Sequence, residues 1–395
     1  MKKDELSLIK DIRNRFPFPE GIGIGDDSAV LKIKESALIT TDLMIEDVHF
    51  DLGFTSFYHL GFKIVSVNVS DIYAMGGDFR VFLFSLGVPQ TVSDEELNDL
   101  FNGINDALNY YRGFLIGGDL SKSEKIVLSG VAIGETEKPI LRKVAEPEDQ
   151  IFITSYLGLS QAGFYLLRNL SEDSKNIVKS IKNFDLLSDF SESLLSLSES
   201  FPRHFQPFIA HSEQSEESYI KMTHTEGDPS AIPQGDRKKC HSERSEESHA
   251  KELNLPQRKI QLKEIKESLK RHLMPVARKP DKLRNTVKAM MDISDGLLID
   301  LHRLCEESGV GAEIYIDKIP IHPEVAKVAE LFNIDPMKII LSGGEDYELL
   351  VISDKGKLTE TGLIPIGKII KNKGIYVVDP MKGKFPAKPE GWQHF

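Results

Sequence analysis

Six short acidic clusters, several of them next to glycine, are spread over most of this 395-residue chain. Buried or clustered carboxylates repel one another, so a protein that gathers so many needs cations to hold them. Oxygen ligands without a Cys or His framework suit Mg²⁺, which keeps waters and carries substrate phosphates. The clusters therefore predict phosphate chemistry. They are Gly-Ile-Gly-Asp-Asp at 23–27, Thr-Thr-Asp at 40–42, Asn-Val-Ser-Asp at 68–71, Gly-Gly-Asp at 117–119, Asp-Ile-Ser-Asp-Gly at 292–296 and Gly-Gly-Glu-Asp-Tyr at 343–347.

Two of these clusters follow apolar segments in the first part of the chain. Thr40, Thr41 and Asp42 end the apolar run 37–39, where hydroxyls beside a carboxylate offer hard ligands to a metal. Asp71 follows a helix-like apolar run, and a carboxylate in such surroundings needs a partner or loses its charge. Capping of the strand end is the plainer interpretation of the threonines, so Asp71 is the stronger candidate ligand.

Two glycine-rich turns are weaker candidates for phosphate loops. The turn that ends at Asp27 is not G-x-G-x-x-G, and the chain has no G-x-x-x-x-G-K-[ST], so neither a Rossmann nor a Walker site is supported. A tight turn with solvated acids is the plainer interpretation there. Gly118 and Asp119 close the apolar run 114–116, where glycine lets backbone amides approach a phosphate and Asp119 can hold its metal.

A third turn is harder to explain by packing. Asp292, Ser294 and Asp295 lie between apolar residues, and a strand-to-helix turn that exposes two carboxylates and a hydroxyl points to a ligand. Arg142 could clamp a phosphate through two hydrogen bonds, or be an ordinary solvated arginine. His49 taken alone is more typical of a hydrogen-bonded structural histidine.

Hydrophobic periodicity places these residues on helices and strands that alternate along the chain. Ser93 and Glu96 predict a capping box at the start of one helix. Helices are expected at 4–15, 56–76, 94–111, 160–169 and 296–307, and strands at 28–33, 37–41, 79–88, 113–117, 126–134 and 150–155.

The chain is expected to form two α/β domains, an N-terminal one over 1–140 and a C-terminal one over 148–395. A low-complexity stretch at about 200–257 interrupts the second. There His-Ser-Glu-Gln-Ser-Glu-Glu-Ser at 211–218 recurs as His-Ser-Glu-Arg-Ser-Glu-Glu-Ser at 241–248. Such a composition cannot bury enough apolar surface to offset its ordering entropy, so we predict a disordered surface insertion.

Composition excludes several classes of protein. The net charge of −12 argues against unassisted binding to nucleic acid or to an anionic membrane. Cys240 and Cys305 are the only cysteines, which leaves no disulfide framework and no zinc spacing. The charged first residues do not resemble a secretory signal, and no window approaches 18 uninterrupted apolar residues. A cytoplasmic protein is expected.

Taken together, the motifs resemble the thiamine-monophosphate kinase family of the aminoimidazole ribonucleotide synthetase-like superfamily. The ordered set spreads over nearly the whole chain outside roughly 170–260, and its His-Phe pair after the Thr-Thr-Asp segment, with a terminal G-x-x-H-F, is specific to the kinase branch. The matching stretches are GIGDDSAVL (23–31), TTDLMIEDVHF (40–50), VNVSDIYAMGG (67–77), IGGDLSKS (116–123), MDISDGLLIDL (291–301), LSGGEDYELL (341–350) and GWQHF (391–395).

The resemblance implies transfer of the γ-phosphoryl group of ATP to thiamine phosphate, giving thiamine diphosphate and ADP. It also implies an α/β (α+β) fold of two domains, a homodimer formed by the mixed N-terminal sheets, several Mg²⁺ ions, and ATP as co-substrate. By the same resemblance, the metal ligands would be Asp27, Thr41, Asp42, Asp71, Asp119 and Asp292, with Thr40 and Asp295 also near metals. Gly118, Asp119, Arg142 and Ser294 would contact ATP, and His49, Glu345 and Trp392 would line the thiamine phosphate pocket.

Three positions depart from the usual pattern of the family: Asp47, Phe79 and Leu120 stand where glycine, proline and threonine are common. Two other functions remain open. One is another ATP-dependent synthetase of the same superfamily, although no cysteine lies near the N-terminal glycine segment, which argues against selenophosphate synthesis. The other is a non-catalytic module that binds a nucleotide or a divalent metal.

Overall fold

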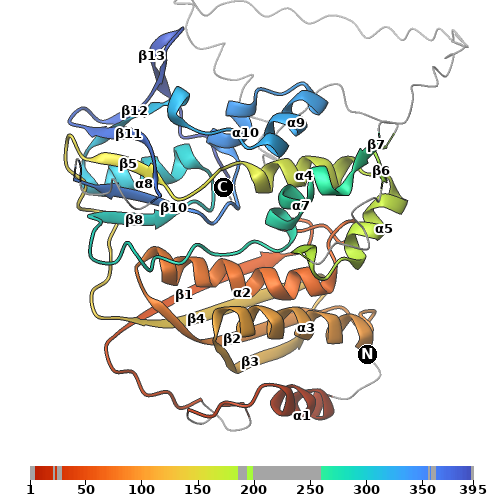
Figure 1. Cartoon of the computed structure of the whole chain (residues 1–395). Helices are drawn as coiled ribbons and strands as arrows, with labels where there is room; N and C mark the ends of the chain where they lie inside the picture. The colour runs from red at the N-terminus through yellow and green to blue at the C-terminus, as the bar shows by residue number, and fades with distance from the viewer. Residues whose placement is uncertain are drawn as a thin grey trace, which may run out of the picture.

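The computed structural model describes residues 5–20, 23–24, 29–185, 194–198, 259–354, 356 and 362–392. Two mixed β-sheets with helices packed against them form this part of the chain (Figure 1). The predicted metal ligand Asp27 and the insertion predicted at about 200–257 lie outside the described residues. No helix in the described part of the chain combines the length and the apolar character that a membrane span requires.

The first sheet is formed by β1 (Ser36–Ile45), β2 (Asp78–Val88), β3 (Phe114–Lys122) and β4 (Val127–Thr136), in the order β1-β4-β2-β3. β4 pairs antiparallel with both β1 and β2, whereas β2 and β3 are parallel. A parallel pair needs a crossover connection, which helix α3 (Asp94–Tyr111) provides.

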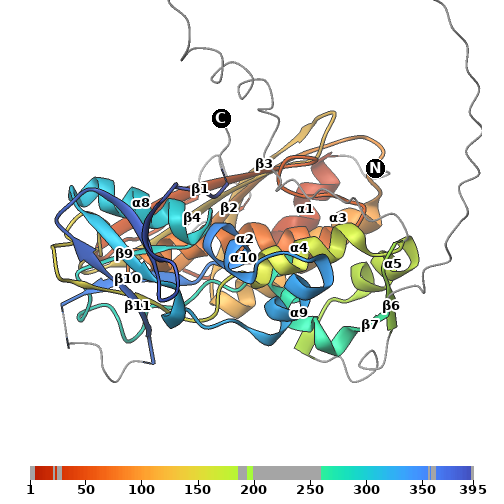
Figure 2. The same cartoon turned by 90° about the horizontal axis from the view of Figure 1, so that it is seen from above.

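Helices α2 (Phe57–Ala74) and α3 cover one face of this sheet (Figures 1 and 2). They approach each other closely because both carry glycine at the contact: a Cβ on Gly61 would lie 2.0 Å from the carbonyl oxygen of Leu100, and one on Gly103 would lie 2.0 Å from that of Tyr58. Helix α1 (Glu5–Arg15) lies beside α3, and the ring of Phe16, just beyond its end, packs 6.2 Å from that of Phe101.

The opposite face of the first sheet carries exposed apolar side chains. Ile39 and Leu43 of β1 are 69% and 49% exposed, because alternate residues of a strand point to opposite faces. Leu38 and Met44, by contrast, face the helices and are buried.

The second sheet has the order β13-β12-β9-β11-β5-β10-β8. β9 and β12 are parallel, and the other pairs are antiparallel. Its strands are β5 (Gln150–Ile153), β8 (Ala289–Asp292), β9 (Gly311–Tyr315), β10 (Leu349–Ser353), β11 (Ile364–Ile370), β12 (Gly374–Asp379) and β13 (Gly383–Ala387).

Helices of the second half include α4 (Leu159–Asn169), α5 (Glu172–Ser180), α7 (Lys266–Leu273), α8 (Leu297–Ser308), α9 (Pro323–Phe332) and α10 (Pro336–Ser342). α4 and α7 pack closely, since a Cβ on Gly163 would lie 2.1 Å from the carbonyl oxygen of Ser268. The short strands β6 (Leu194–Ser196) and β7 (Lys259–Gln261) pair antiparallel. This pairing joins the two chain segments that flank residues 199–258.

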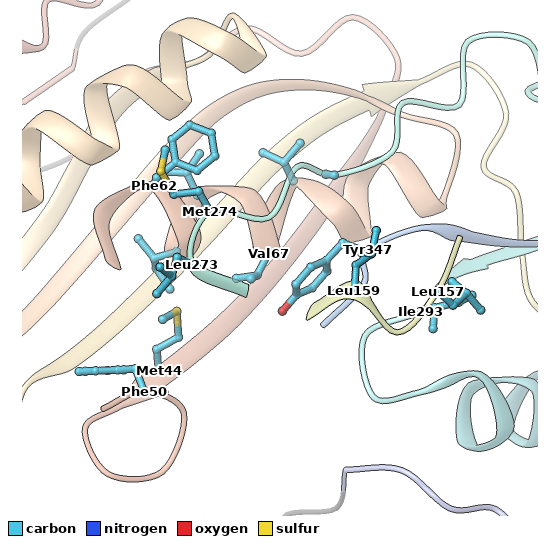
Figure 3. Close-up of a cluster of buried hydrophobic side chains, with 14 of the residues drawn as sticks. Met44, Phe50, Phe62, Val67, Leu157, Leu159, Leu273, Met274, Ile293 and Tyr347 are labelled. Atoms are coloured by element: carbon cyan, nitrogen blue, oxygen red, sulfur yellow. The ribbon is translucent and has the colours of Figure 1, made fainter. Parts of the chain in front are cut away.

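One hydrophobic core runs between the halves of the molecule. Val67 of α2, Leu159 of α4, Leu273 of α7 and Tyr347 before β10 belong to a single cluster of buried side chains (Figure 3). Because residues from both halves share this core, it holds the two halves together around the cavity described below.

Most predicted elements are present, with ends that match or are shifted by up to five residues. The predicted strand at 28–33 is not: residues 29–34 show only a single bridge, at Val30. The capping box of α3 forms as predicted, since Ser93 Oγ accepts from Glu96 N and Ser93 N donates to the Glu96 carboxylate.

Candidate functional site

A cavity of about 810 Å³ is lined by residues from both halves of the molecule. α2 and β1 contribute side chains from the first half. The turn after β8, helix α4 and the segment before β10 contribute side chains from the second. Of the residues predicted to form the site, the cavity brings together Asp42, His49, Asp71, Asp292, Ser294, Asp295, Glu345 and Trp392.

Three of these aspartates come from three different elements and repel one another. Burial, with the nearby charges of Asp71 and Asp295, raises the pKa of Asp42 to about 7. Burial, and then the charge of Asp71, raises the pKa of Asp292 well above its usual value. Partly or fully buried carboxylates that repel one another in this way are chemically suited to bind a cation.

Neighbouring hydroxyl groups orient two of the three carboxylates. Thr40 Oγ1 donates to Asp71 Oδ2 at 2.5 Å, and Ser70 Oγ donates to Asp292 Oδ2 at 2.6 Å. Burial raises the pKa of Asp71, while Thr40 and the positive charge of Arg142 oppose that rise. The exposed Arg142 is therefore close enough to act on Asp71 electrostatically, as a phosphate-binding arginine at this site would be.

The turn that follows β8 is shaped by a buried carboxylate. Asp300 Oδ2 accepts from the backbone N–H groups of Ser294, Asp295 and Gly296, at 3.1, 3.0 and 3.1 Å. Arg303 Nη1 bonds both Asp300 and Asp295. These bonds fix the direction in which Ser294 and Asp295 enter the cavity.

The segment before β10 approaches this turn at Gly344, whereas the preceding Gly343 packs against helix α10. A Cβ on Gly343 would lie 2.3 Å from the carbonyl oxygen of Ile339, and one on Gly344 would lie 2.7 Å from that of Ser294. Glu345 follows with φ of 63°, a left-handed conformation that costs energy for a residue other than glycine. Its backbone N–H donates to the carbonyl oxygen of Ser294 at 2.6 Å.

Two side chains hold the carboxylate of Glu345. Lys63 Nζ lies 2.7 Å from Oε1, and His272 Nδ1 lies 3.2 Å from Oε2. Burial alone would raise the pKa of Glu345, but Lys63 and His272 lower it to about 2. Glu345 is therefore ionised throughout the neutral range.

Two aromatic residues of the predicted substrate pocket also lie in the cavity. The rings of His49 and Trp392 have centroids 6.4 Å apart. The backbone N–H of Trp392 donates to the carbonyl oxygen of Asp295 at 2.9 Å, which ties the end of the described chain to the turn after β8.

Five of the predicted site residues that the structure describes do not line the cavity. Thr40 and Arg142 act on Asp71 from outside it. The other three are Thr41, Gly118 and Asp119. Thr41 is exposed, in alternation with Thr40 and Asp42, and its Oγ1 donates to the carbonyl oxygen of Gly130. Gly118 and Asp119 are exposed on β3, the far edge of the first sheet. Asp119 lies in register with Leu43 of β1 across three strand spacings, or about 14 Å. Gly118 also has a packing role, because a Cβ there would lie 1.9 Å from the carbonyl oxygen of Phe84.

The side-chain oxygens of this site are of the kind that Mg²⁺ prefers, but they are not already arranged around one metal position. Carboxylate and hydroxyl oxygens are the ligands that Mg²⁺ prefers, and their mutual repulsion leaves a need for positive charge. Among the residues that the structure describes, no group of three or more Asp, Glu, His or Cys side chains already surrounds one metal position.

The sequence-based predictions omit Lys63 and His272. The sequence could have indicated Lys63, because it lies inside the apolar run Phe62 to Val65 of a predicted helix. A lysine buried among such residues needs a polar partner. His272 had no such signal, since it lies among charged residues at the end of α7.

Two models of the AIR synthase related protein family match the chain: the N-terminal domain model over residues 25–136 and the C-terminal domain model over residues 241–379. Together they span more than half of it. The thiamine-monophosphate kinase of Aquifex aeolicus is 29% identical over 377 residues, which cover 94% of this chain and 92% of that relative. The thiamine-monophosphate kinase of Bacillus subtilis is 40% identical over 171 residues, covering 42% of this chain and 53% of that relative.

The fold agrees with these sequence relationships. A solved structure described as AaThiL complexed with AMPPCP and TMP is 27% identical and has a TM-score of 0.64, with coverage of 99% of this chain and 97% of that one. The chain therefore belongs to the AIR synthase related family and, within it, to the thiamine-monophosphate kinases.

Proposed function

We propose that this protein transfers the γ-phosphoryl group of ATP to the phosphate of thiamine phosphate, giving thiamine diphosphate and ADP. The observation that carries the proposal is one cavity with buried, mutually repelling aspartates in one part and the rings of His49 and Trp392 in another. The first part suits phosphates with their cations, and the second suits a flat cationic heterocycle. The relative whose structure holds AMPPCP and TMP supports both substrates.

The aspartates Asp42, Asp71 and Asp292 would hold several Mg²⁺ ions, with Thr40 and Asp295 beside them. When bound there, Mg²⁺ supplies positive charge that screens the repulsion between two anionic reactants and neutralises charge on the transferred group. Because the acceptor phosphate is already largely ionised near neutral pH, it needs little help from a general base. The protein's own contribution is therefore to position the reactants, with Arg142 and Ser294 toward ATP and His49, Glu345 and Trp392 toward thiamine phosphate.

We also propose a homodimer, which the exposed face of the first sheet supports. Ile39 and Leu43 form an apolar strip there, and a second copy packed on this face would cover it. Thr41, Gly118 and Asp119 lie on or beside the same face, so any role for them toward metal or ATP depends on that dimer. Sedimentation of the purified chain measures its oligomeric state.

Two further assignments belong to the same proposal. We divide the chain into an N-terminal domain over 1–140 and a C-terminal domain over 148–395, because the strands of the two sheets fall on either side of residues 140–148. We place the reaction in the cytoplasm, where ATP is made and consumed.

The deciding experiment incubates the purified protein with Mg²⁺, ATP and thiamine phosphate and identifies the product by mass. Thiamine diphosphate formed in step with ADP is the expected result. ADP release with an aminoimidazole precursor but not with thiamine phosphate would indicate that the protein is another synthetase of the same superfamily. Nucleotide binding without any ADP release would make it a binding module.

A further inference from the structure

Lys63 is an unusual residue for the place that it occupies. It lies in the middle of α2, where almost every side chain is buried, and it is itself 3% exposed. Removing an ammonium group from water costs several kcal/mol, and a buried ion pair is often no more stable than apolar side chains of the same volume. Stability alone therefore gives no reason for a lysine at this position.

The partners of Lys63 all belong to the second half of the molecule. Its Nζ lies 2.7 Å from Glu345 Oε1 and donates to the carbonyl oxygen of His272 at 3.1 Å. Nδ1 of His272 in turn lies 3.2 Å from Glu345 Oε2. The neutral histidine tautomer that carries its proton on Nδ1 can donate this hydrogen bond. Both oxygens of one carboxylate are thus held from two directions, by α2 and by α7.

The carboxylate that is held in this way faces the cavity. Lys63, His272 and Glu345 all line it, and the side chain of Glu345 is 31% exposed. Each carboxylate oxygen has two lone pairs, so one donor on each oxygen leaves acceptor sites directed toward a ligand. Glu345 also keeps a left-handed backbone, and such strain persists where a site needs a side chain in one direction.

We propose that Lys63 and His272 are positioning residues that hold the Glu345 carboxylate in one orientation, so that it is ready to accept a hydrogen bond from thiamine phosphate. The inference rests on the proposed function, because it takes Glu345 as a group that contacts that substrate. On this view, the contact of Lys63 with Glu345 and His272, which joins the two halves of the molecule, favours binding of thiamine phosphate and has no effect on ATP.

The test compares substitutions that remove or keep each donor. Lys63→Met removes the ammonium group at nearly constant length, and His272→Leu removes the Nδ1 donor, whereas His272→Asn keeps a donor at the Nδ1 position. Glu348→Gln is the matched control, because it breaks a different buried ion pair, outside the residues that line the cavity.

We expect Lys63→Met and His272→Leu to raise KM for thiamine phosphate about tenfold or more, because hydrogen bonds to charged groups are lost. KM for ATP should stay within about twofold, and His272→Asn should recover most of the loss. Trp392 is the only tryptophan of the chain and lines the same cavity, so quenching of its fluorescence measures thiamine phosphate binding without turnover.

Two results would overturn the inference. One is an unchanged thiamine phosphate KM in both Lys63→Met and His272→Leu. The other is a rise in both substrates' KM values that also occurs in Glu348→Gln, which would mark a general loss of structure. If Lys63→Met does not fold, the comparison of His272→Leu with His272→Asn decides. Failure of the proposed function looks different, since the wild-type protein itself would then form no thiamine diphosphate.

Discussion

The buried acids of this protein fall into two groups, those of the cavity and those of the scaffold, and their partners differ. In the scaffold, Glu348 is 1% exposed and bonds both Arg271 and Arg278, while Thr154 donates to it at 2.7 Å. In the cavity, burial raises the pKa of both Asp42 and Asp71, and nearby carboxylates add to the rise. Glu348 is thus neutralised by the chain itself, whereas Asp42 and Asp71, when ionised, leave negative charge that a cation could balance.

Other scaffold acids follow the same pattern. Glu324 accepts from the backbone and the hydroxyl of Ser268, at 2.7 and 2.8 Å, and Asp300 accepts from three consecutive backbone N–H groups. A buried carboxylate with a full set of donors indicates a structural role. One whose neighbours are mainly other carboxylates indicates a ligand from outside the chain.

Breaking the scaffold group should give the largest effect on stability. Glu348→Gln leaves the guanidinium groups of Arg271 and Arg278 without their carboxylate, and loss of such charge-assisted hydrogen bonds costs about 2 to 3 kcal/mol. Denaturant unfolding should show this loss, while kcat of the folded fraction stays near that of the wild type. A steep fall in kcat with unchanged stability would reverse the assignment of Glu348 to the scaffold.

Asp71→Asn should give the opposite pattern. Turnover is expected to fall on the order of 100-fold, the effect of removing one electrostatic group from an active site. The free energy of unfolding should stay within about 1 kcal/mol of wild type, because the substitution also removes repulsion from nearby carboxylates. Initial rates and denaturant unfolding measured on one preparation test both parts. Near-normal turnover would contradict a ligand role for Asp71.

A smaller effect is expected at Asp346, a scaffold acid that is buried without an ion pair of its own. Its Oδ2 accepts from Gly158 N at 2.7 Å, and burial raises its pKa to about 7. Between about pH 4 and 7 the folded state then holds a proton that the unfolded state releases, so stability from this group falls as pH rises.

Asp346→Asn removes that titration. The melting temperature of the variant, relative to wild type, should therefore rise by a few degrees between pH 5 and pH 8. Melting curves at several pH values provide the measurement. A difference that stays constant with pH would show that Asp346 does not titrate in this range.

The smallest effect is expected from deletion of residues 199–258. β6 and β7 are paired on either side of this segment, and Ser198 N donates to the carbonyl oxygen of Asn169 at 2.8 Å, so a short turn can close the gap. Replacing this connection by a turn of a few residues lowers the entropic cost of closing it by about 2 kcal/mol, since each halving of its length is worth about 0.6 kcal/mol. We expect KM for both substrates and kcat to stay within about twofold, measured by ADP release. A large loss of activity would assign the segment a role in the site.

Part of the site could be predicted from the sequence. The residue patterns indicated Asp42, Asp71 and Asp292, and the family resemblance added His49, Glu345 and Trp392; one cavity contains these six residues but not the predicted ligand Asp119. The period of two along a strand could also have separated Thr41 from Thr40 and Asp42, because adjacent strand residues point to opposite faces. The approach of α2 to the segment before β10 had no comparable signal.

Local sequence determined most of the predicted helices and strands and the capping box of α3, as well as the oxygen chemistry of the site, because each depends on residues within a few positions of one another. Tertiary structure alone decided that Lys63, His272 and Glu345 meet, since they lie far apart in the chain and converge only when the two sheets share one core. It also decided which acids are neutralised and which still need a cation, because the charge that a carboxylate experiences depends on burial and on neighbours from other elements.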